Sequence, residues 1–379
     1  MKTIDARRFW EPLFAAADIR LDGRRPEDIR VLDERFFDRL LRGGELGAGE
    51  SFMDGDWDCE RLDVLAAKAG LARLRDRMRR DWRTILAGVR ALVVSPNRRS
   101  KAFEIGRRHY DLGNDLYSAM LDRRMVYTCA YWRGLEQVPE NLDRAQEAKL
   151  DLVCRKLSLA PGMRVLDIGG GWGSFARFAA EKYGARVVSM TVSREQKSLA
   201  DRLCEGLPVV NRLQDYRAVD EPFDRVVSLG MFEHVGRRNY RTYMRVARRC
   251  LREGGIFLLH TIADNASELA MNAWTAKHIF PNSELPSAAQ IAAAAEGLFV
   301  VEDWHNLGPY YDPTLMAWWH NFHAAWPRLR DKYGEKFYRT WKLYLQGSAG
   351  GFRARTMQVW QVVLSVGGVP GGAQAFRST

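Results

Sequence analysis

Met163-Arg-Val-Leu-Asp-Ile-Gly-Gly-Gly-Trp-Gly-Ser174 is a short apolar run that ends in glycines, and a helix is expected to begin directly behind it, at about Phe175. This pattern predicts a buried parallel strand, a tight turn and a helix. The glycines allow positive φ angles and let the backbone come close to a ligand, while the amides of the helix start face an anion or a carboxylate. Many nucleotide-binding folds share such a turn, so by itself it does not identify the ligand.

Strands and helices alternate from this segment onward, which predicts an α/β fold with a doubly wound, seven-stranded Rossmann-like sheet. In such a sheet the ligand lies at the carboxyl ends of the strands. The predicted strands are 164–168, 186–191, 208–213, 224–229, 255–261, 298–304 and 357–365. The predicted helices between them are 173–183, 193–205, 239–252 and 287–295.

Two further regions flank or interrupt this alternation. Residues 1–95 are predicted to form a small, mainly helical N-terminal domain, and residues 96–379 form the α/β domain. Within the latter, residues from about 265 to 350 are rich in Trp and Phe. We interpret this insertion as a helical lid over an apolar substrate, with extra core for a large domain as an equally common alternative.

Composition restricts the class of protein. With 379 residues, 46% apolar and 28% charged, the chain is globular. It has no apolar run long enough to span a bilayer and no visible secretory signal, so we expect a cytoplasmic protein. The five cysteines are scattered and form no C-x-x-C pair, which predicts free thiols rather than a zinc site or a disulfide framework.

The net charge of +11 is concentrated in one stretch. Between Leu71 and Arg108 there are twelve basic and three acidic residues, with apolar residues recurring at helical spacing. A basic amphipathic helix of this kind is typical of binding to anionic lipid headgroups. Packing of the apolar stripe against its own domain is the alternative. No aromatic platform or nucleic-acid module accompanies the charge, so we predict no nucleic-acid partner.

The polar residues at the strand ends favour one cofactor. A nicotinamide dinucleotide site would have Asp or Glu near the end of the second strand, to hold the ribose, but Thr191 stands there. With Asp167 in the first strand, this favours S-adenosylmethionine. Asp215 and Tyr216, after the third strand, are well placed to meet an adenine ring by hydrogen bonding and stacking. Ser193 and Gln196 have the spacing of a capping box, which is their structural alternative.

Two ionisable residues close apolar strands at the same edge of the predicted sheet. Glu233 follows the fourth strand and His260 ends the fifth, so we expect them side by side at the ligand edge. A buried charge there needs a partner and is often functional, although His260 taken alone could be a satisfied core histidine. His320 and His323 are spaced for a metal, but no third ligand joins them, so we predict no metal site.

Several motifs together resemble bacterial cyclopropane-fatty-acyl-phospholipid synthases, a family of S-adenosylmethionine-dependent methyltransferases. The resemblance covers nearly the whole chain. The motifs that carry it are His109-Tyr-Asp-Leu-Gly-Asn-Asp-Leu-Tyr117, Cys129-Ala-Tyr-Trp132, Pro161-Gly-Met-Arg-Val-Leu-Asp-Ile-Gly169, Met231-Phe-Glu-His-Val-Gly236, His260-Thr-Ile262, Glu302-Asp-Trp-His-Asn306 and Phe352-Arg-Ala-Arg355.

The resemblance implies that a methylene bridge is added across a cis double bond of a phospholipid acyl chain. It implies a cofactor site in which Tyr127 and Thr128 hold the methionine end, above Gly169, Gly170 and Gly171, with Thr191 and Gln196 on the ribose side and Asp215 and Tyr216 at the adenine. It implies a bicarbonate ion held by Cys129, Glu233, His260, Ile262 and Tyr311. It also implies a homodimer that docks on an anionic bilayer, peripherally on the cytoplasmic face of the inner membrane.

The chain departs from the family at two positions. Gly170 replaces a frequent Cys, which we expect to be tolerated because the backbone makes that contact. Ser348 replaces another frequent Cys, so a thiol at 348 is not required if the protein is active.

Other functions are compatible with parts of the pattern. An ordinary S-adenosylmethionine methyltransferase acting on another lipid would not need the cluster of Cys129, Glu233, His260 and Tyr311, and a non-enzymatic scaffold would not bind the cofactor. The sequence leaves open whether the product is a cyclopropane or a methyl or methylene branch. It also leaves open whether bicarbonate or a side chain is the base, and which acyl chains and headgroups are used.

Overall fold

The computed structural model describes residues 6–74, 113–267 and 271–372. The chain divides into two compact units, each of which is described by itself. The basic segment between Leu71 and Arg108 and the first residues of the motif at 109–117 lie almost entirely outside the described residues. What was inferred for them therefore stays a prediction.

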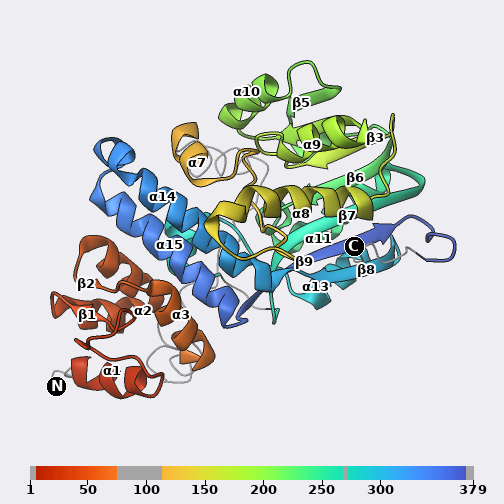
Figure 1. Ribbon diagram of the computed structural model, residues 1–379. Helices are drawn as coiled ribbons and strands as arrows, with labels where there is room; N and C mark the ends of the chain where they lie inside the picture. Colours follow the sequence, from red (N-terminus) through yellow and green to blue (C-terminus); the bar gives the residue numbers. More distant parts are fainter. Residues whose placement is uncertain (1–5, 75–112, 268–270, 373–379) are drawn as a thin grey trace. The chain divides into compact units, whose positions relative to one another are not determined.

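The larger unit is built on a seven-stranded sheet with the order β5-β4-β3-β6-β7-β9-β8 (Figure 1). The pairings of β3 with β4 and β6, of β4 with β5, and of β6 with β7 are parallel, whereas β8 runs antiparallel to β9. The strands are β3 (Arg164–Ile168), β4 (Arg186–Thr191), β5 (Val209–Leu213), β6 (Phe223–Leu229), β7 (Leu251–Asp264), β8 (Val300–Asn306) and β9 (Met357–Ser365). The chain order reverses between β3 and β6, so the topological switch point lies at these two neighbouring strands.

Helices cover both faces of this sheet. On one face, α8 and α9 pack on β3, β4, β6 and β7 through residues such as Val153 and Phe178. On the other, α11 and α13 contribute Tyr243 and Ile291 to a second apolar cluster. The helices of this unit are α7 (Asn114–Met120), α8 (Leu142–Lys156), α9 (Ser174–Tyr183), α10 (Arg194–Leu203), α11 (Tyr240–Arg249) and α13 (Ala288–Ala295), with short 3-10 turns η3 (Pro139–Asn141), η4 (Tyr216–Ala218), η5 (Phe232–His234), η6 (Arg237–Asn239) and η7 (Gly308–Tyr310).

The predicted fold class is confirmed. The strands predicted at 164–168, 186–191 and 357–365 coincide with β3, β4 and β9. The main difference is β7, which begins at Leu251 instead of residue 255 because Leu251 already pairs with Phe223 ahead of an irregularity in the register. The carboxyl ends of β3, β4 and β6 thus meet where the sequence predicts a ligand.

The smaller unit is mainly helical and has its own apolar core around Phe36, Phe52 and Trp57. Its elements are α1 (Ala6–Ala15), α2 (Arg35–Asp54), α3 (Leu62–Leu71), α12 (Ala273–His278), α14 (Tyr311–Tyr333) from Leu315 onward and α15 (Glu335–Arg353), with a two-stranded sheet of β1 (Arg30–Val31) and β2 (Trp57–Asp58). Close packing holds α15 on α3, because a Cβ on Gly350 would lie 2.3 Å from the carbonyl oxygen of Asp63.

The predicted lid segment is divided between the two units. Its helices α12, α15 and most of α14 belong to the compact unit that contains the N-terminal helices, whereas α13 and β8 belong to the sheet unit. An apolar, aromatic composition predicts burial but does not say which core a helix joins, so the boundaries differ from those predicted. The aromatic residues do cluster: the rings of Trp326 and Tyr338 lie 4.9 Å apart. A lid function stays a prediction.

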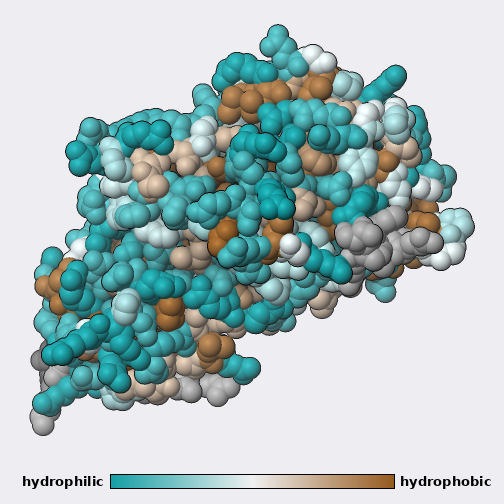
Figure 2. Space-filling view, in the orientation of Figure 1, coloured by the Kyte–Doolittle hydropathy of each residue, from teal (hydrophilic) through white to brown (hydrophobic). Residues whose placement is uncertain are grey.

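The surface view shows mostly hydrophilic residues on the face presented, with hydrophobic residues in small separate groups (Figure 2). Within the described parts of the chain, none of the helices has both the length and the apolar character needed to cross a membrane.

Candidate active site

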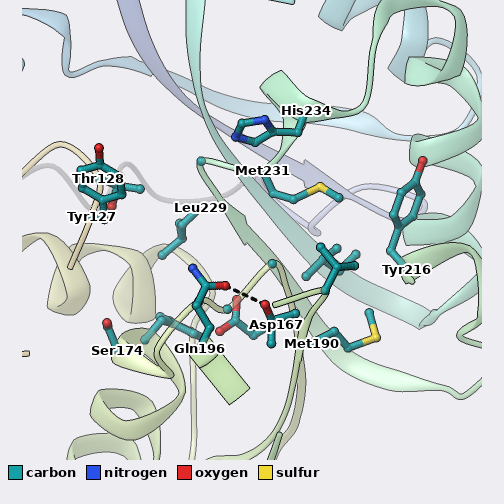
Figure 3. A pocket seen from close by; sticks show the side chains of 18 of the residues that line it. Tyr127, Thr128, Asp167, Ser174, Met190, Gln196, Tyr216, Leu229, Met231 and His234 are labelled. Atoms are coloured by element: carbon teal, nitrogen blue, oxygen red, sulfur yellow. Dashed lines mark hydrogen bonds between the residues drawn. The ribbon is translucent and has the colours of Figure 1, made fainter. Parts of the chain in front are cut away.

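A pocket lies at the carboxyl ends of β3, β4 and β6, at the switch point of the sheet. In Figure 3, Tyr127 and Thr128 lie at one end of it and Tyr216 at the other, with Asp167 and Gln196 between them on one side and His234 and Met231 opposite. All nine residues predicted to contact the cofactor line this pocket: Tyr127, Thr128, Gly169, Gly170, Gly171, Thr191, Gln196, Asp215 and Tyr216. Residues distant in the sequence therefore form one elongated site.

The glycine turn is fixed by its neighbour strand. The amides of Gly169 and Gly170 both donate to the carbonyl oxygen of Met190, at 3.0 and 2.9 Å. Gly169 has φ +84°, which strongly favours glycine, and a Cβ there would lie 2.7 Å from the Met231 side chain. At Gly170 a Cβ would lie only 1.9 Å from Ser189 Oγ. Glycine at 169 is therefore favoured by both the turn and the packing, whereas at 170 the side chains of Ser189 and Asp167 occupy the space that a Cβ would take.

The centre of the pocket carries a buried carboxyl group and a polar pair. Burial raises the pKa of Asp167 to about 7, although Ser189 and the charge of Lys149 oppose the shift. Thr191 Oγ1 donates to Gln196 Oε1 at 2.7 Å. The N-cap part of the capping-box alternative is confirmed, because the Ser193 hydroxyl accepts from the amide of Gln196 at the start of α10. Gln196 thus serves the helix through its backbone and lines the pocket through its side chain.

The predicted adenine end contains a pre-formed ion pair. The Asp215 carboxylate accepts two hydrogen bonds from the Arg217 guanidinium, at 2.8 and 2.6 Å, and one from the Arg217 amide. The same guanidinium lies 5.4 Å from the centre of the Tyr216 ring. Tyr216 is buried against Tyr243, with ring centres 4.9 Å apart. Arg217, which the sequence did not single out, therefore orients both residues predicted to meet the adenine.

Glu233 lies in η5, directly after β6, and its side chain turns toward the end of β7. One carboxyl oxygen, Oε1, accepts from the backbone N–H of Ile262 at 2.6 Å. The other, Oε2, is buried and has no hydrogen-bond partner among the described residues. Burial raises the pKa of Glu233 to about 7, and the hydrogen bond from the Ile262 amide opposes this shift, as do other nearby donors of the backbone and of Thr261.

His260 sits at the end of the parallel pairing between β6 and β7, opposite Leu229. Its ring is buried, and Gln361 Nε2 lies 3.4 Å from its Nδ1. Burial and the nearby charges of Lys149 and Lys156 hold the pKa of His260 well below its usual value, so the ring is neutral at neutral pH. Glu233 bonds to the same strand end, because Ile262, two residues after His260, donates its backbone N–H to Glu233. That the two side chains act together at the ligand stays a prediction.

Cys129 and Tyr311 lie in two other segments, the loop before α8 and the first turn of α14, which contact each other. The Cys129 thiol donates to the carbonyl oxygen of Leu307 at 3.6 Å, just before η7. Thr314, in the first turn of α14, accepts from the amide of Ala130 at 3.1 Å, and Tyr311 is buried in the same turn. Burial raises the pKa of the Cys129 thiol far above its usual value, so it is a neutral, weak donor and not a thiolate.

Gly230 lines the pocket and contacts both His260 and Thr128, the residue before Cys129. Its amide donates to the carbonyl oxygen of His260 at 2.9 Å, and a Cβ on it would lie 2.8 Å from the Thr128 methyl group. Both Gly230 and Thr128 line the pocket. The residues with an implied bicarbonate role do not line it themselves: they are Cys129, Glu233, His260, Ile262 and Tyr311. Cys129 and Glu233 are next in sequence to the lining residues Thr128 and His234, and His260 bonds through its carbonyl oxygen to the lining residue Gly230.

Three polar residues of this region were missed by the sequence interpretation. Lys149 on α8 is fully buried and donates to Thr128 Oγ1 at 2.9 Å. Gln146, one turn earlier, donates to the Thr128 carbonyl oxygen at 2.9 Å. His234 lines the pocket, shares a 2.7 Å hydrogen bond with Ser283, and has its pKa lowered to about 4 by burial. On a helix, Gln146 and Lys149 look like a solvated face, and only the tertiary structure shows their burial.

Comparisons with known proteins agree with this geometry. The chain is 49% identical over 370 residues to the cyclopropane-fatty-acyl-phospholipid synthase of Escherichia coli K12, covering 98% of this chain and 96% of that protein. It is 34% identical to the tuberculostearic acid methyltransferase UfaA1 of Mycobacterium tuberculosis, covering 88% of this chain and 81% of that protein.

A crystal structure of mycolic acid cyclopropane synthase CmaA1, complexed with SAH and CTAB, has a similar fold. Its TM-score is 0.65 at 32% identity, over 72% of this chain and 99% of that one. Residues 97–362 match the family described as mycolic acid cyclopropane synthetase. With that match, and with the relatives and the shared fold, the chain belongs to the mycolic acid cyclopropane synthetase family.

Proposed function

We propose that this protein is an S-adenosylmethionine-dependent methyltransferase that adds a methylene bridge across the cis double bond of unsaturated phospholipid acyl chains. The 49% identical relative carries this activity in its name and spans nearly the whole chain. The observation that carries the chemistry is the unpartnered, buried Oε2 of Glu233, the residue that precedes the pocket-lining His234. A buried carboxyl oxygen without a partner is costly unless a ligand completes it.

The reaction requires positioning and then a base. An alkene is a poor nucleophile, so the protein must hold it in line with the sulfonium methyl group. The alkene π electrons form the new carbon–carbon bond while the carbon–sulfur pair stays on sulfur, which leaves a cation on the acyl chain. Loss of a proton from the new methyl group then closes the ring. The site must therefore contain a base that accepts this proton and is not itself methylated by the cofactor.

Bicarbonate fits the donors and acceptors present. When bound, it would supply a small base. Glu233 Oε2 is an open acceptor for the hydroxyl of such an ion, and the neutral His260 ring has a nitrogen able to donate to its oxygens. The N–H of Ile262 donates to Glu233 in this structure. We therefore assign Ile262 to the orientation of the Glu233 carboxyl group.

A second assignment of the base is direct action by Glu233. Its pKa of about 7 suits a group that accepts a proton at neutral pH. A second product class is a methyl or methylene branch, since it starts from the same cation; the 34% identical relative is named for tuberculostearic acid methylation. The experiment below separates these products.

The protein is further proposed to work as a homodimer, docked on the cytoplasmic face of the inner membrane. The homodimer rests on the family resemblance. The support for docking is the basic stretch between Leu71 and Arg108, which contains twelve basic and three acidic residues. Its charge suits an anionic bilayer, which supplies the phospholipid substrate.

The deciding experiment incubates the full chain with isotopically labelled S-adenosylmethionine and vesicles of an unsaturated, anionic phospholipid. We expect labelled acyl chains heavier by one methylene group, loss of the olefinic proton signals and appearance of cyclopropane ring signals. Vesicles of the saturated phospholipid serve as the control and should take up no label. New exomethylene signals, or label confined to the headgroup, would contradict the proposal and support the alternatives.

A further inference from the structure

Lys149 is an ammonium group in an unusual place. It lies on α8 beside Leu150 and Val153, which belong to the apolar cluster on one face of the sheet. Its side chain is fully buried, and it also forms part of the wall of the cofactor pocket. Burying a charged amine costs free energy unless hydrogen bonds and an opposite charge compensate it. The partners of Lys149 therefore matter.

Within the described parts of the chain, the ammonium of Lys149 makes a single hydrogen bond, to Thr128 Oγ1 at 2.9 Å, and no ion pair. The carboxyl groups of Asp122 and Asp167 are close enough to favour its charge, but neither comes within ion-pair distance. An ammonium group carries several N–H donors. Lys149 thus retains hydrogen-bonding capacity that the described side chains do not fill, in a wall that faces the pocket.

The other charges of the pocket are differently placed. Arg217 is engaged by both oxygens of Asp215, and His234 is neutral because burial lowers its pKa to about 4. Thr128 lies at the end of the pocket opposite Tyr216 (Figure 3). An anionic group of a ligand is therefore stabilised most at the end of the pocket where Lys149 bonds to Thr128. The ion pair of Asp215 and Arg217, which orients Tyr216, lies at the other end.

We propose that Lys149 binds the amino-acid carboxylate of the cofactor, with Thr128 held in place as its neighbour. This assignment rests on the proposed function, in which the adenine lies at Tyr216 and the amino-acid end at Thr128. The family resemblance implies Tyr127 and Thr128 for the methionine end. Lys149 is an additional, charged group that donates a hydrogen bond to Thr128. Gln146, which bonds to the Thr128 carbonyl oxygen at 2.9 Å, fixes the same residue from the backbone side.

The protonation state of Lys149 is also expected to change with pH. Burial lowers the pKa of Lys149 to about 8, and the carboxyl groups of Asp122 and Asp167 oppose this shift. The thiols of Cys129 and Cys154, which also lie near it, stay neutral because burial raises their pKa values. His260 lies near enough for the same ammonium to lower its pKa. A ligand carboxylate prefers the protonated amine. Affinity that depends on this ion pair therefore falls as the pH rises through the pKa of Lys149 in the complex.

The test compares two ligands that differ by one group, S-adenosylhomocysteine and its decarboxylated analogue, which keeps the amine and lacks the carboxylate. Both are titrated calorimetrically into the full-length protein and into Lys149→Met. We expect Lys149→Met to weaken S-adenosylhomocysteine by roughly tenfold or more and the analogue by less than roughly threefold. Equal loss of both ligands, or no loss of either, would overturn the proposal.

Two controls separate ion pairing from folding. Lys156→Met removes another buried lysine of α8, one paired with Asp303 outside the pocket, and should change both ligands equally. If Lys149→Met does not fold, the wild-type protein still decides: its affinity for S-adenosylhomocysteine should fall between about pH 7 and pH 10 relative to the analogue. Parallel profiles would refute the assignment.

A bicarbonate arm separates the two possible sources of a carboxylate-like group. If Lys149 holds an inorganic anion instead, Lys149→Met abolishes the heat of binding measured on titration with bicarbonate. It then leaves the affinity for S-adenosylhomocysteine unchanged, and this result overturns the proposal. If neither nucleoside binds the wild-type protein, the cofactor assignment itself fails, independently of Lys149.

Discussion

Glu233 accepts a 2.6 Å hydrogen bond from the backbone N–H of Ile262 through one carboxyl oxygen, while its other oxygen is buried without a partner among the described residues. The first contact fixes the carboxyl group to the end of β7, beside His260. The second oxygen is the one that the proposed function assigns to a ligand.

Glu233→Gln should abolish turnover while the cofactor still binds. The amide keeps the acceptor for Ile262 but replaces the open acceptor by a donor, which neither binds the hydroxyl of an anion nor accepts a proton. The check is acyl-chain product formation together with calorimetric affinity for S-adenosylhomocysteine, expected to change by less than roughly threefold. A parallel loss of affinity would assign Glu233 to the cofactor site instead.

The same substitution should change how stability depends on pH. In the folded protein the pKa of Glu233 is raised from 4.5 to about 7, so folding favours its protonated form. Its contribution is most favourable below about pH 4.5 and is lost as the pH rises through about 7. Glu233→Gln should therefore gain stability relative to wild type across this window, by up to about 3 kcal/mol. Denaturant unfolding of both proteins at several pH values measures the difference, and a constant difference would contradict a buried, titrating carboxyl group.

Much of the sheet could be predicted because parallel strands buried on both faces appear as short apolar runs between glycine and proline turns. β3 and β4 were located to the residue on this basis. The N-terminal extension of β7 could not, because Arg252-Glu-Gly-Gly255 looks like a turn and joins the strand only through pairing of the preceding Leu251 with Phe223.

From strand positions alone, only part of the site was predictable, and residues such as Tyr127 and Tyr311 came from the family resemblance. Thr191 ends β4, and Asp215 and Glu233 lie in the segments that follow β5 and β6, so the topology brings them to one edge. Lys149 comes from the middle of a helix, where a lysine normally indicates solvent, and its burial depends on how α8 packs. Likewise, α14 and α15 are visible as helices in the sequence, but their grouping with the N-terminal helices is a tertiary property.

Gly170→Ala should weaken cofactor binding, and Ser189→Ala should partly restore it. A Cβ at position 170 would lie 1.9 Å from Ser189 Oγ and 2.5 Å from Asp167 Oδ2, so these side chains or the turn must shift, and removal of the Ser189 hydroxyl relieves the closer of the two contacts. We expect Gly170→Ala to lower S-adenosylhomocysteine affinity by roughly tenfold and the double variant to recover about half of that free energy. Ser189→Ala alone is the control. Simple additivity of the two changes would show that Ser189 does not limit the space at Gly170.

Replacement of Arg77, Arg79, Arg80 and Arg83 by Glu should weaken activity on anionic vesicles, because each change removes a positive charge from the basic stretch and adds a negative one. Vesicle co-sedimentation measures binding, and S-adenosylhomocysteine titration checks that the pocket is intact. Activity on zwitterionic vesicles should change much less. Unchanged binding to anionic vesicles would place the docking surface elsewhere in the chain.

Gln361→Leu should lower turnover without changing cofactor affinity. Gln361 is fully buried in the apolar strand β9, its Nε2 lies 3.4 Å from His260 Nδ1, and its Oε1 has no partner among the described residues. An amide that donates to Nδ1 keeps the proton of the neutral ring on Nε2, which leaves Nε2–H as a donor for an anion. Leucine fills a similar volume but removes this preference.

The tautomer of His260 can be measured directly from the ¹⁵N chemical shifts of its ring. In the wild-type protein we expect the neutral Nε2–H form at about pH 7, since burial and the charges of Lys149 and Lys156 lower the pKa of this imidazole. Gln361→Leu should show a mixture of tautomers, and Gln361→Glu, which can only accept when ionised, should favour Nδ1–H. A wild-type ring already protonated on Nδ1 would mean that the Gln361 amide is turned the other way, with Oε1 as the acceptor, and that the other nitrogen of His260 faces the site as an acceptor.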